Sequence, residues 1–192
     1  MKININDIIS NEDYASERKT RRLKVIEIKK YRRIDVGPVV SMYFENRETM
    51  IYQIQEMALT ENIVKDDLHK EMKAYNPLVP DGKELVATMM IEIDDSIRRK
   101  SFLSRLGGIE TKVKFFIGEI EINAEAEEDI DRTTADGKAS SVHFLHFKFT
   151  KELIEKFKNP NVMIKIGIEH EHYGHIAMLN KSNIETLSKD FN

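Results

Sequence analysis

The stretch IGIEHEHYGHIAML, residues 166–179, decides how the C-terminal part of this chain folds. Side chains alternate between the two faces of a strand, so Val162, Ile164, Ile166 and Ile168 share one apolar face. This alternation predicts a strand that packs on the core, followed by a turn and a returning arm.

Three of the chain's six histidines stand close together in this stretch. His170 and His172 continue the apolar face, which predicts that they lie at the edge of the core. A turn at Tyr173-Gly174 would make His172 and His175 cross-strand neighbours, with Cβ atoms about 5 Å apart. Three converging imidazoles would suit zinc or non-haem iron, with water or a carboxylate completing the shell. The alternative is a strand end that is merely rich in histidine, because this pattern matches no named metal motif.

A fourth histidine depends on the sheet topology. In HFLHFKF, residues 143–149, His143 shares the apolar face of a predicted strand, and His146 points the other way. If this strand and the strand of His170 are antiparallel neighbours, His143 and His170 meet at one end. If the two strands form a parallel unit through a helix at 151–158, the histidines lie about 20 Å apart.

Towards the N-terminus, Ser10 is a helix N-cap, and we expect a helix from there to about Tyr31. Residues at helical spacing form one inward stripe, and they are Tyr14, Arg18, Arg21, Val25, Ile28 and Arg32. Arginines on an inward face need carboxylate partners, since an unpaired buried charge is costly. We therefore expect Arg18 or Arg21 to pair with Glu45, Glu56 or Glu92.

The remaining elements mix strands and helices without regular alternation. Strands are predicted at 34–44 (interrupted at Gly37-Pro38), 84–94, 111–122, 141–150 and 161–172. Further helices are predicted at 47–58 after the N-cap Asn46, at about 62–74, in the basic stretch near 100, at 151–158 and near the C-terminus. The polar segment 123–138 is predicted to be an exposed loop. This order predicts an α+β fold, one domain over residues 1–192, with a mostly antiparallel or mixed sheet flanked by N-terminal helices.

Composition excludes several classes of chemistry. The 192 residues contain no cysteine, so disulfides, thiol nucleophiles and cysteine-ligated iron–sulfur clusters are ruled out. The net charge of −3 selects neither nucleic acid nor an anionic membrane. The basic run at 19–33 is spread around its helix and carries no nucleic-acid fold signature, which favours a solvated helix. The N-terminus is too polar for a signal peptide, and no apolar run would span a bilayer, so the expected compartment is the cytoplasm.

Charged and aromatic residues define a second candidate site. One interpretation is a pocket that binds a small polar or anionic ligand, and its candidate residues are Arg18, Arg21, Glu45, Arg47, Glu56, Glu92, His143 and Tyr173. The other interpretation is a structural ion-pair network between helix and sheet. We favour the network, because such networks also occur away from functional sites.

Several longer segments resemble one protein family over nearly the whole chain. They are YASERKTRRLKVIEIKKYRRIDVGP, FENRETMIYQIQEM, YNPLVPDGKELVATMMIEI, SSVHFLHF and EHEHY. The family is an uncharacterised prokaryotic domain of unknown function of about this length. Residues that match its pattern are Tyr14, Arg18, Glu45, Asn46, Arg47, Thr49, Gln53, Glu56, Tyr75, Asn76, Pro77, Glu92, His143, His170 and Tyr173. This chain departs from the pattern at Glu171, where proline is usual, and at His146, where arginine is usual.

The resemblance implies a functional context but no activity. Members of this family are often encoded beside rubrerythrin and a cysteine-rich iron–sulfur oxidoreductase, which implies a link to peroxide defence or electron transfer. We therefore expect a cytoplasmic accessory or binding protein, with rubrerythrin or the iron–sulfur oxidoreductase as its partner. The alternative is a metal-binding protein or metal-dependent enzyme that uses His170, His172 and His175.

Overall fold

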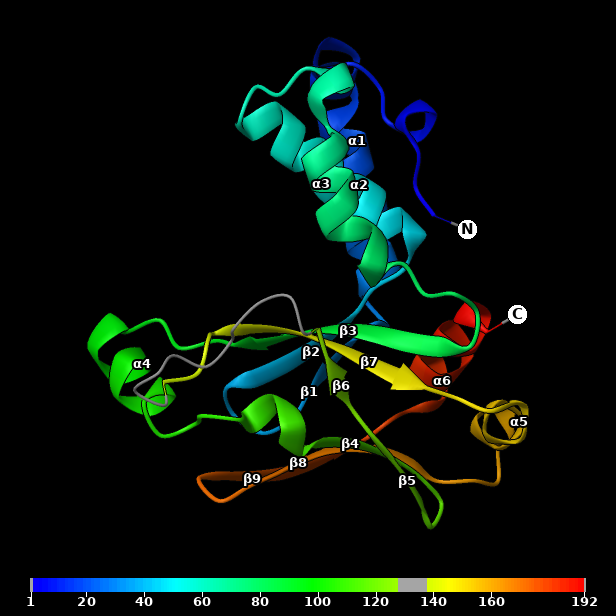
Figure 1. Cartoon of the computed structure of the whole chain (residues 1–192). Coiled ribbons are helices and arrows are strands. Elements are labelled where there is room, and N and C mark those ends of the chain that lie inside the picture. Colours follow the sequence, from blue (N-terminus) through cyan, green and yellow to red (C-terminus); the bar gives the residue numbers. More distant parts are fainter. Residues whose placement is uncertain (1, 128–137, 192) are drawn as a thin grey trace.

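The strands form two antiparallel sheets, as the computed structural model of the chain shows (Figure 1); residues 2–127 and 138–191 are described. The five-stranded sheet has the spatial order β1 (Arg33–Asp35), β2 (Val40–Phe44), β3 (Glu84–Ile91), β7 (Val142–Lys148) and β6 (Glu125–Ala126). The four-stranded sheet has the order β5 (Ile120–Asn123), β4 (Val113–Ile117), β8 (Ile164–His170) and β9 (Tyr173–Met178).

The main core lies between the two sheets, because each sheet turns one apolar face towards the other. On β3, for example, Leu85, Ala87 and Met89 are fully buried in this core. Phenylalanine rings from both sheets meet at its centre, where the Phe115 centroid lies 4.8 Å from that of Phe147 in an edge-to-face contact. Such ring pairs add to the free energy gained by burying the side chains.

A helical unit stands on the outer face of the five-stranded sheet (Figure 1). It contains η1 (Ile5–Asp7), α1 (Asn11–Lys29), α2 (Arg47–Thr60), η2 (Lys65–Asp67), α3 (His69–Tyr75) and η3 (Asn76–Leu78). This unit has a small core of its own, to which the sheet contributes the buried Val86. Ser10 and Asn46 cap α1 and α2 through side-chain hydrogen bonds to the N–H groups of Asp13 and Thr49, as the sequence predicted.

The other helices close the ends of the sandwich (Figure 1). Helix α4 (Ser96–Leu103) lies at one end, and α5 (Lys151–Lys158), α6 (Lys181–Leu187) and η5 (Ser188–Asp190) lie at the other; η4 (Ile109–Lys112) leads from α4 into β4. In the described ranges 2–127 and 138–191, no helix combines the length and the apolar character needed to cross a bilayer.

A buried ion pair fastens the C-terminal segment to the base of the helical unit. The side chains of Arg32 and Asp190 are only 3% and 7% exposed, and their charged groups are in direct contact. The Arg32 guanidinium also donates to the backbone carbonyls of Phe44 (2.8 Å) and Glu45 (2.9 Å). Burial raises the pKa of the Asp190 carboxyl, and the Arg32 charge opposes that shift. Arg32 is therefore the most buried of the three arginines on the predicted inward stripe. The sequence indicated no partner for it.

The α+β fold in one domain is confirmed, and three details of the prediction are wrong. The strands form two sheets rather than one. The segment predicted as one strand at 111–122 is the hairpin β4–β5, which turns at Gly118 with a φ of +59°. The predicted loop at 123–138 contains Asn123, the last residue of β5, and then β6, which pairs with β7. The remainder of that prediction, residues 128–137, lies outside the described residues.

Candidate functional site

The strongest candidate site is a cleft between the helical unit and the outer face of the five-stranded sheet. Its cavity measures about 260 Å³. The lining residues come from α1, α2, α3, η3 and three strands, and they are Lys29, Tyr43, Glu45, Met50, Gln53, Tyr75, Leu78, Thr88, Met90, Val142 and Phe144. We call it the Glu45 cleft. It has the mainly apolar lining with a few polar groups that is typical of small-molecule sites.

Strand alternation creates the floor of the Glu45 cleft. On β3, Met89 is fully buried towards the other sheet, whereas its neighbours Thr88 and Met90 turn to the outer face. On β7, Phe144 turns to the same outer face, and Thr88 is its cross-strand partner. The helical unit does not cover this part of the sheet fully, so these side chains stay partly exposed.

Glu45 is the buried charged group of the cleft. In the chain, Glu45 comes directly after β2 and directly before Asn46, the N-cap of α2. The residue is only 4% exposed. One carboxylate oxygen accepts a hydrogen bond from the Thr49 hydroxyl (2.6 Å), and the other accepts one from the Thr88 hydroxyl (2.8 Å). Within the described residues, no lysine, arginine or histidine lies at ion-pair distance from this carboxylate. A carboxylate so deeply buried is unusual without a cationic partner.

The lining of the cleft also carries polar groups that can reach a ligand. The Lys29 ammonium lies 5.9 Å from the centroid of the Tyr43 ring, a cation–π distance. Gln53 and Tyr75 add an amide and a hydroxyl from α2 and α3. The arrangement can hold a molecule that has an apolar body, one end near Glu45 and the other near Lys29.

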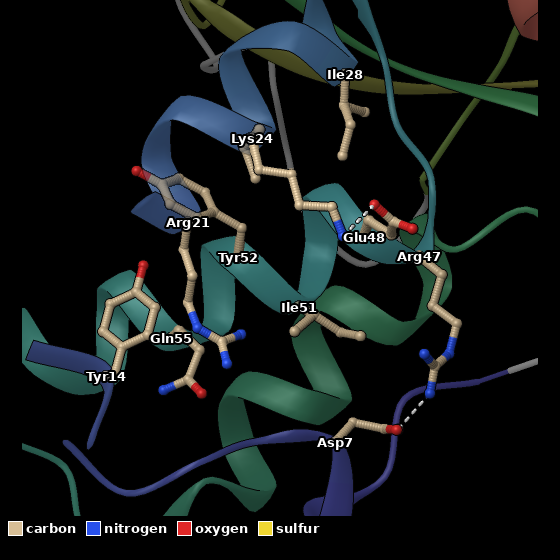
Figure 2. A pocket seen from close by; sticks show the side chains of 11 residues that line it. Asp7, Tyr14, Arg21, Lys24, Ile28, Arg47, Glu48, Ile51, Tyr52 and Gln55 are labelled. Carbon is tan, nitrogen blue, oxygen red and sulfur yellow. Dashed lines mark ion pairs between the residues drawn. The ribbon is translucent and has the colours of Figure 1, made fainter. Parts of the chain in front are cut away.

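A second hollow, the α1–α2 groove, lies on the other side of α2 and measures about 290 Å³ (Figure 2). Figure 2 shows the Arg21 guanidinium and the Gln55 amide at one end, and Arg47 with Asp7 at the other, with Ile51 between them. Arg47 pairs with Asp7 at 2.5 Å, and Arg21 pairs at 2.8 Å with a glutamate on its own helix. Lys24 also faces a carboxylate, Glu48, at 3.7 Å.

Polar groups beside the α1–α2 groove bind one another. The Glu56 carboxylate accepts from the Tyr14 hydroxyl (2.6 Å) and pairs with Arg18 (2.7 Å), as the sequence predicted for Arg18. The hydrogen bond from Arg18, assisted by that from Tyr14, holds the pKa of Glu56 below its usual value. Burial, and then the hydrogen bond to Glu56, raises the pKa of Tyr14. Arg18 is half exposed, so the pair joins two helices at the surface. The groove is thus mainly a structural ion-pair network.

Glu92 belongs to a third cluster, on the exposed part of the same sheet face. It accepts hydrogen bonds from the hydroxyls of Ser41 (2.6 Å) and Tyr43 (3.1 Å) and pairs with Arg33 (3.1 Å). Tyr43 therefore separates Glu92 from the Glu45 cleft. The arginines and carboxylates of the candidate pocket are therefore divided among three places rather than lining one cavity.

The three clustered histidines do not converge as predicted. The hairpin turns at Glu171-His172, so His172 lies in the turn and His175 pairs with Ile168 instead. Both ring nitrogens of His170 are hydrogen-bonded to the backbone. Nδ1 accepts from the His172 N–H (3.1 Å), and Nε2 donates to the Gly107 carbonyl (3.3 Å).

The side chains on the inner face of β9 also contact the protein itself. The His175 ring packs against the Tyr173 ring in a tilted arrangement, with 4.5 Å between the ring centroids, and it lies over Gly37, where a Cβ would come within 2.6 Å of it. The Tyr173 hydroxyl donates to the Val36 carbonyl at 2.7 Å. Among residues 2–127 and 138–191, no group of three histidines or carboxylates is placed to hold a metal ion.

His143 is fully buried between the sheets, and neither predicted relation to His170 is correct. The two strands belong to different sheets, so they are neither antiparallel neighbours nor a parallel unit. Nε2 of His143 donates to the Ser140 carbonyl (2.9 Å), and Nδ1 lies 3.6 Å from the Glu110 carboxylate. These contacts hold the His143 ring in place beside the core.

The sequence identified Glu45 but missed most of its neighbours. Thr88 and Met90 could have been assigned to an outer face by the same alternation that buries Met89. Gln53 and Tyr75 stood in segments of the family resemblance. Nothing local in the sequence indicates that the helical unit brings these residues above the sheet.

Comparisons with known proteins agree with the resemblance seen in the sequence. Residues 2–191 match the family model described as "Protein of unknown function (DUF3501)". The fold is similar to a crystal structure of a protein of unknown function from Burkholderia pseudomallei K96243, with a TM-score of 0.92, 34% sequence identity and 100% of each chain covered. A comparison with curated proteins gives no match. The chain therefore belongs to the DUF3501 family, an uncharacterised family whose model spans nearly all of it.

Proposed function

We propose that this chain is a binding protein and that the Glu45 cleft takes a small molecule with an apolar body and a positively charged amine. The observation that carries this proposal is the buried Glu45 carboxylate, which receives two hydroxyl hydrogen bonds but no cation from the described residues. A ligand ammonium would supply the missing charge in a site where water screens poorly.

The rest of the cleft supports a ligand of this kind. Met50, Leu78, Met90 and Phe144 provide apolar contacts along its length. Lys29, which also lines the cleft, would repel an amine placed beside it and so favour the orientation in which the amine points to Glu45. The two threonine hydroxyls already fix the carboxylate, so little side-chain entropy is lost on binding.

The test compares three probes of equal length: hexylamine, hexanol and hexanoate. Calorimetric titration and thermal unfolding should show hexylamine binding to the wild type most tightly. In Glu45→Gln the affinity for hexylamine should fall about tenfold or more, the size expected for one charge-assisted hydrogen bond. Glu92→Gln is the control, because it removes a carboxylate from the same sheet face outside the cleft. Equal binding of hexylamine and hexanol, or no change in Glu45→Gln, would show that Glu45 does not select an amine.

We also propose that binding in this cleft serves a redox or peroxide-defence system. This part rests on the family resemblance, with rubrerythrin or an iron–sulfur oxidoreductase as the expected partner. Since the chain has no cysteine, its role would be to bind or position rather than to carry electrons on thiols or a cysteine-ligated cluster. Sedimentation of the purified chain mixed with each candidate partner tests the association.

The sequence also raised metal binding by His170, His172 and His175, although these rings do not come together in the described part of the chain. The test of metal binding is metal analysis of protein purified without an affinity tag, for the wild type and His170→Ala. Stoichiometric zinc or iron that is lost in the variant would support it, whereas equal trace metal in both proteins would count against it.

A further inference from the structure

Strand β9 is an edge of the four-stranded sheet, and in the described part of the chain no strand pairs with its outer side. The β8–β9 hairpin closes on the hydrogen-bonded pair His170–Tyr173, so alternate residues from Tyr173 onward direct their backbone groups to β8. Gly174, Ile176 and Met178 consequently direct their N–H and C=O groups away from the sheet.

Two of these residues, Ile176 and Met178, place their side chains on the outer face of the four-stranded sheet. Ile176 is 58% exposed and Met178 is 64% exposed, and Met163 at the start of the neighbouring strand is 54% exposed. The sequence of β9, YGHIAM, contains no lysine, arginine, carboxylate or proline. Natural edge strands are normally protected by such residues against pairing with other chains. The β9 edge is therefore both apolar and unprotected.

We propose that β9 pairs with β9 of a second copy of this chain. The two strands run antiparallel about a twofold axis at Ile176, so that the two four-stranded sheets become one continuous sheet. In this register Ile176 faces its own equivalent, and Gly174 faces Met178 of the other copy. All three outward residues are then in hydrogen-bonded pairs, and the open edge is closed on both copies.

The shape of the outer face fits this register. A Cβ built on Gly174 would meet nothing within 4 Å, so this end of β9 leaves an open space on the sheet surface. The register places the exposed Met178 side chain of the other copy beside that space. The twofold axis repeats the contact, so each copy offers one projecting side chain and one space.

The charges beside β9 fit as well. On β8, Lys165 is the cross-strand neighbour of Met178, and Glu169 is the neighbour of Gly174. In the joined sheet, one row of neighbouring residues crosses the seam. Its order is Lys165 and Met178 of one copy, then Gly174 and Glu169 of the other. The register therefore brings no like charges face to face across the new seam, and Glu169 stays paired with Lys114 of its own chain at 2.7 Å.

The proposed interface lies on the opposite side of the molecule from the helical unit (Figure 1), so the dimer leaves the Glu45 cleft open. It is also narrow, consisting of one strand and the side chains beside it. We therefore expect a dimer that dissociates on dilution rather than an obligate one.

Sedimentation over a range of protein concentrations tests the dimer. The wild type should approach twice the 22.4 kDa mass of the chain at high concentration. Ile176→Pro removes one outward N–H without removing a bond to β8, and it should leave the protein monomeric. Gly174→Lys fills the open space with a charged side chain that the monomer can place in solvent, and it should have the same effect.

The matched control is Glu121→Pro, which removes an outward N–H from β5, the other edge of the same sheet. It should dimerise like the wild type, and circular dichroism should confirm that each variant is folded. A wild type that stays monomeric up to its solubility limit would overturn the proposal. So would a dimer that persists in both folded β9 variants or is lost equally in Glu121→Pro.

Discussion

The sandwich and the helical unit are held together by different kinds of contact. The sandwich has one continuous apolar core in which Phe115 and Phe147 meet between the sheets. The helical unit has a smaller core, and its longest helix, α1, buries only Tyr14 and Val25. Polar contacts hold α1 in place instead, and they include the Tyr14–Glu56 hydrogen bond. We therefore expect the helical unit to open more readily than the sandwich, and the Glu45 cleft lies along the border between them.

The largest effect is expected from Phe115→Ala. Phe115 is fully buried and its ring contacts four other phenylalanine rings. Removing it should lower the free energy of unfolding by about 3–5 kcal/mol, because a cavity opens in the centre of the sandwich. Urea denaturation followed by circular dichroism measures the loss. Phe116→Ala, on the outer face of the same strand, is the control and should cost clearly less; equal losses would mean that the core is not centred on Phe115.

A comparable effect is expected at the junction of the two regions. Asp190→Ala leaves the Arg32 guanidinium buried without its carboxylate, which should cost about 3–5 kcal/mol in the free energy of unfolding. The control is Glu185→Ala, since the Glu185–Lys181 pair is exposed and spans 3.7 Å. Hydrogen exchange should also become faster around Phe44 and Glu45, whose carbonyls Arg32 binds. If Asp190→Ala is as mild as its control, the junction is held by other contacts.

Within the helical unit, Tyr14→Phe removes the hydroxyl that donates to Glu56. A hydrogen bond to a charged group contributes about 1.5–3 kcal/mol, so thermal unfolding should reveal a loss of that order. The pKa of Glu56 is lowered in the folded chain, so the stability from this carboxylate is present above its unfolded pKa and is lost as the pH falls through the folded one. The variant should therefore lose less stability than the wild type on acidification. Tyr31→Phe, on an exposed ring, is the control and should behave like the wild type.

Two matched helix caps sharpen the comparison. Asn46 caps α2 in the helical unit and Asn180 caps α6 beside the sandwich, each with a capping box. Replacing either by alanine should cost about 1 kcal/mol. Hydrogen exchange should show the loss of protection in α2 for Asn46→Ala, with the strands of the sandwich unchanged. A loss of protection that spreads through both regions in Asn46→Ala would show that they open as one unit.

The smallest effect concerns His146, at the edge where β6 meets β7. The hydrogen bond to Glu84 raises the pKa of His146, with a further contribution from the charge of Glu127. A raised histidine pKa adds stability that is complete below the unfolded pKa of about 6.5 and is lost as the pH rises through the folded pKa. His146→Gln should therefore flatten the change of melting temperature above that pH. His172→Gln, in the exposed hairpin turn, is the control and should keep the wild-type profile.

The sequence alone determined the local features of this protein. The Ser10 and Asn46 caps, the interruption at Gly37-Pro38 and the alternating face of β8 all depend on residues a few positions apart, and all are confirmed. The family was also readable from contiguous segments. These features follow from backbone hydrogen bonding and side-chain periodicity, which act within one element.

Only the tertiary structure decided which elements meet. The division of the strands into two sheets placed His143 and His170 apart, and a turn two residues earlier than predicted moved His172 out of the strand. The Glu45 cleft arises because the helical unit packs on one part of a sheet face and leaves Met90 and Phe144 partly uncovered. The alternation of residues along a strand does not tell which other segment covers each face of the sheet. That coverage depends on how segments distant in the sequence pack together.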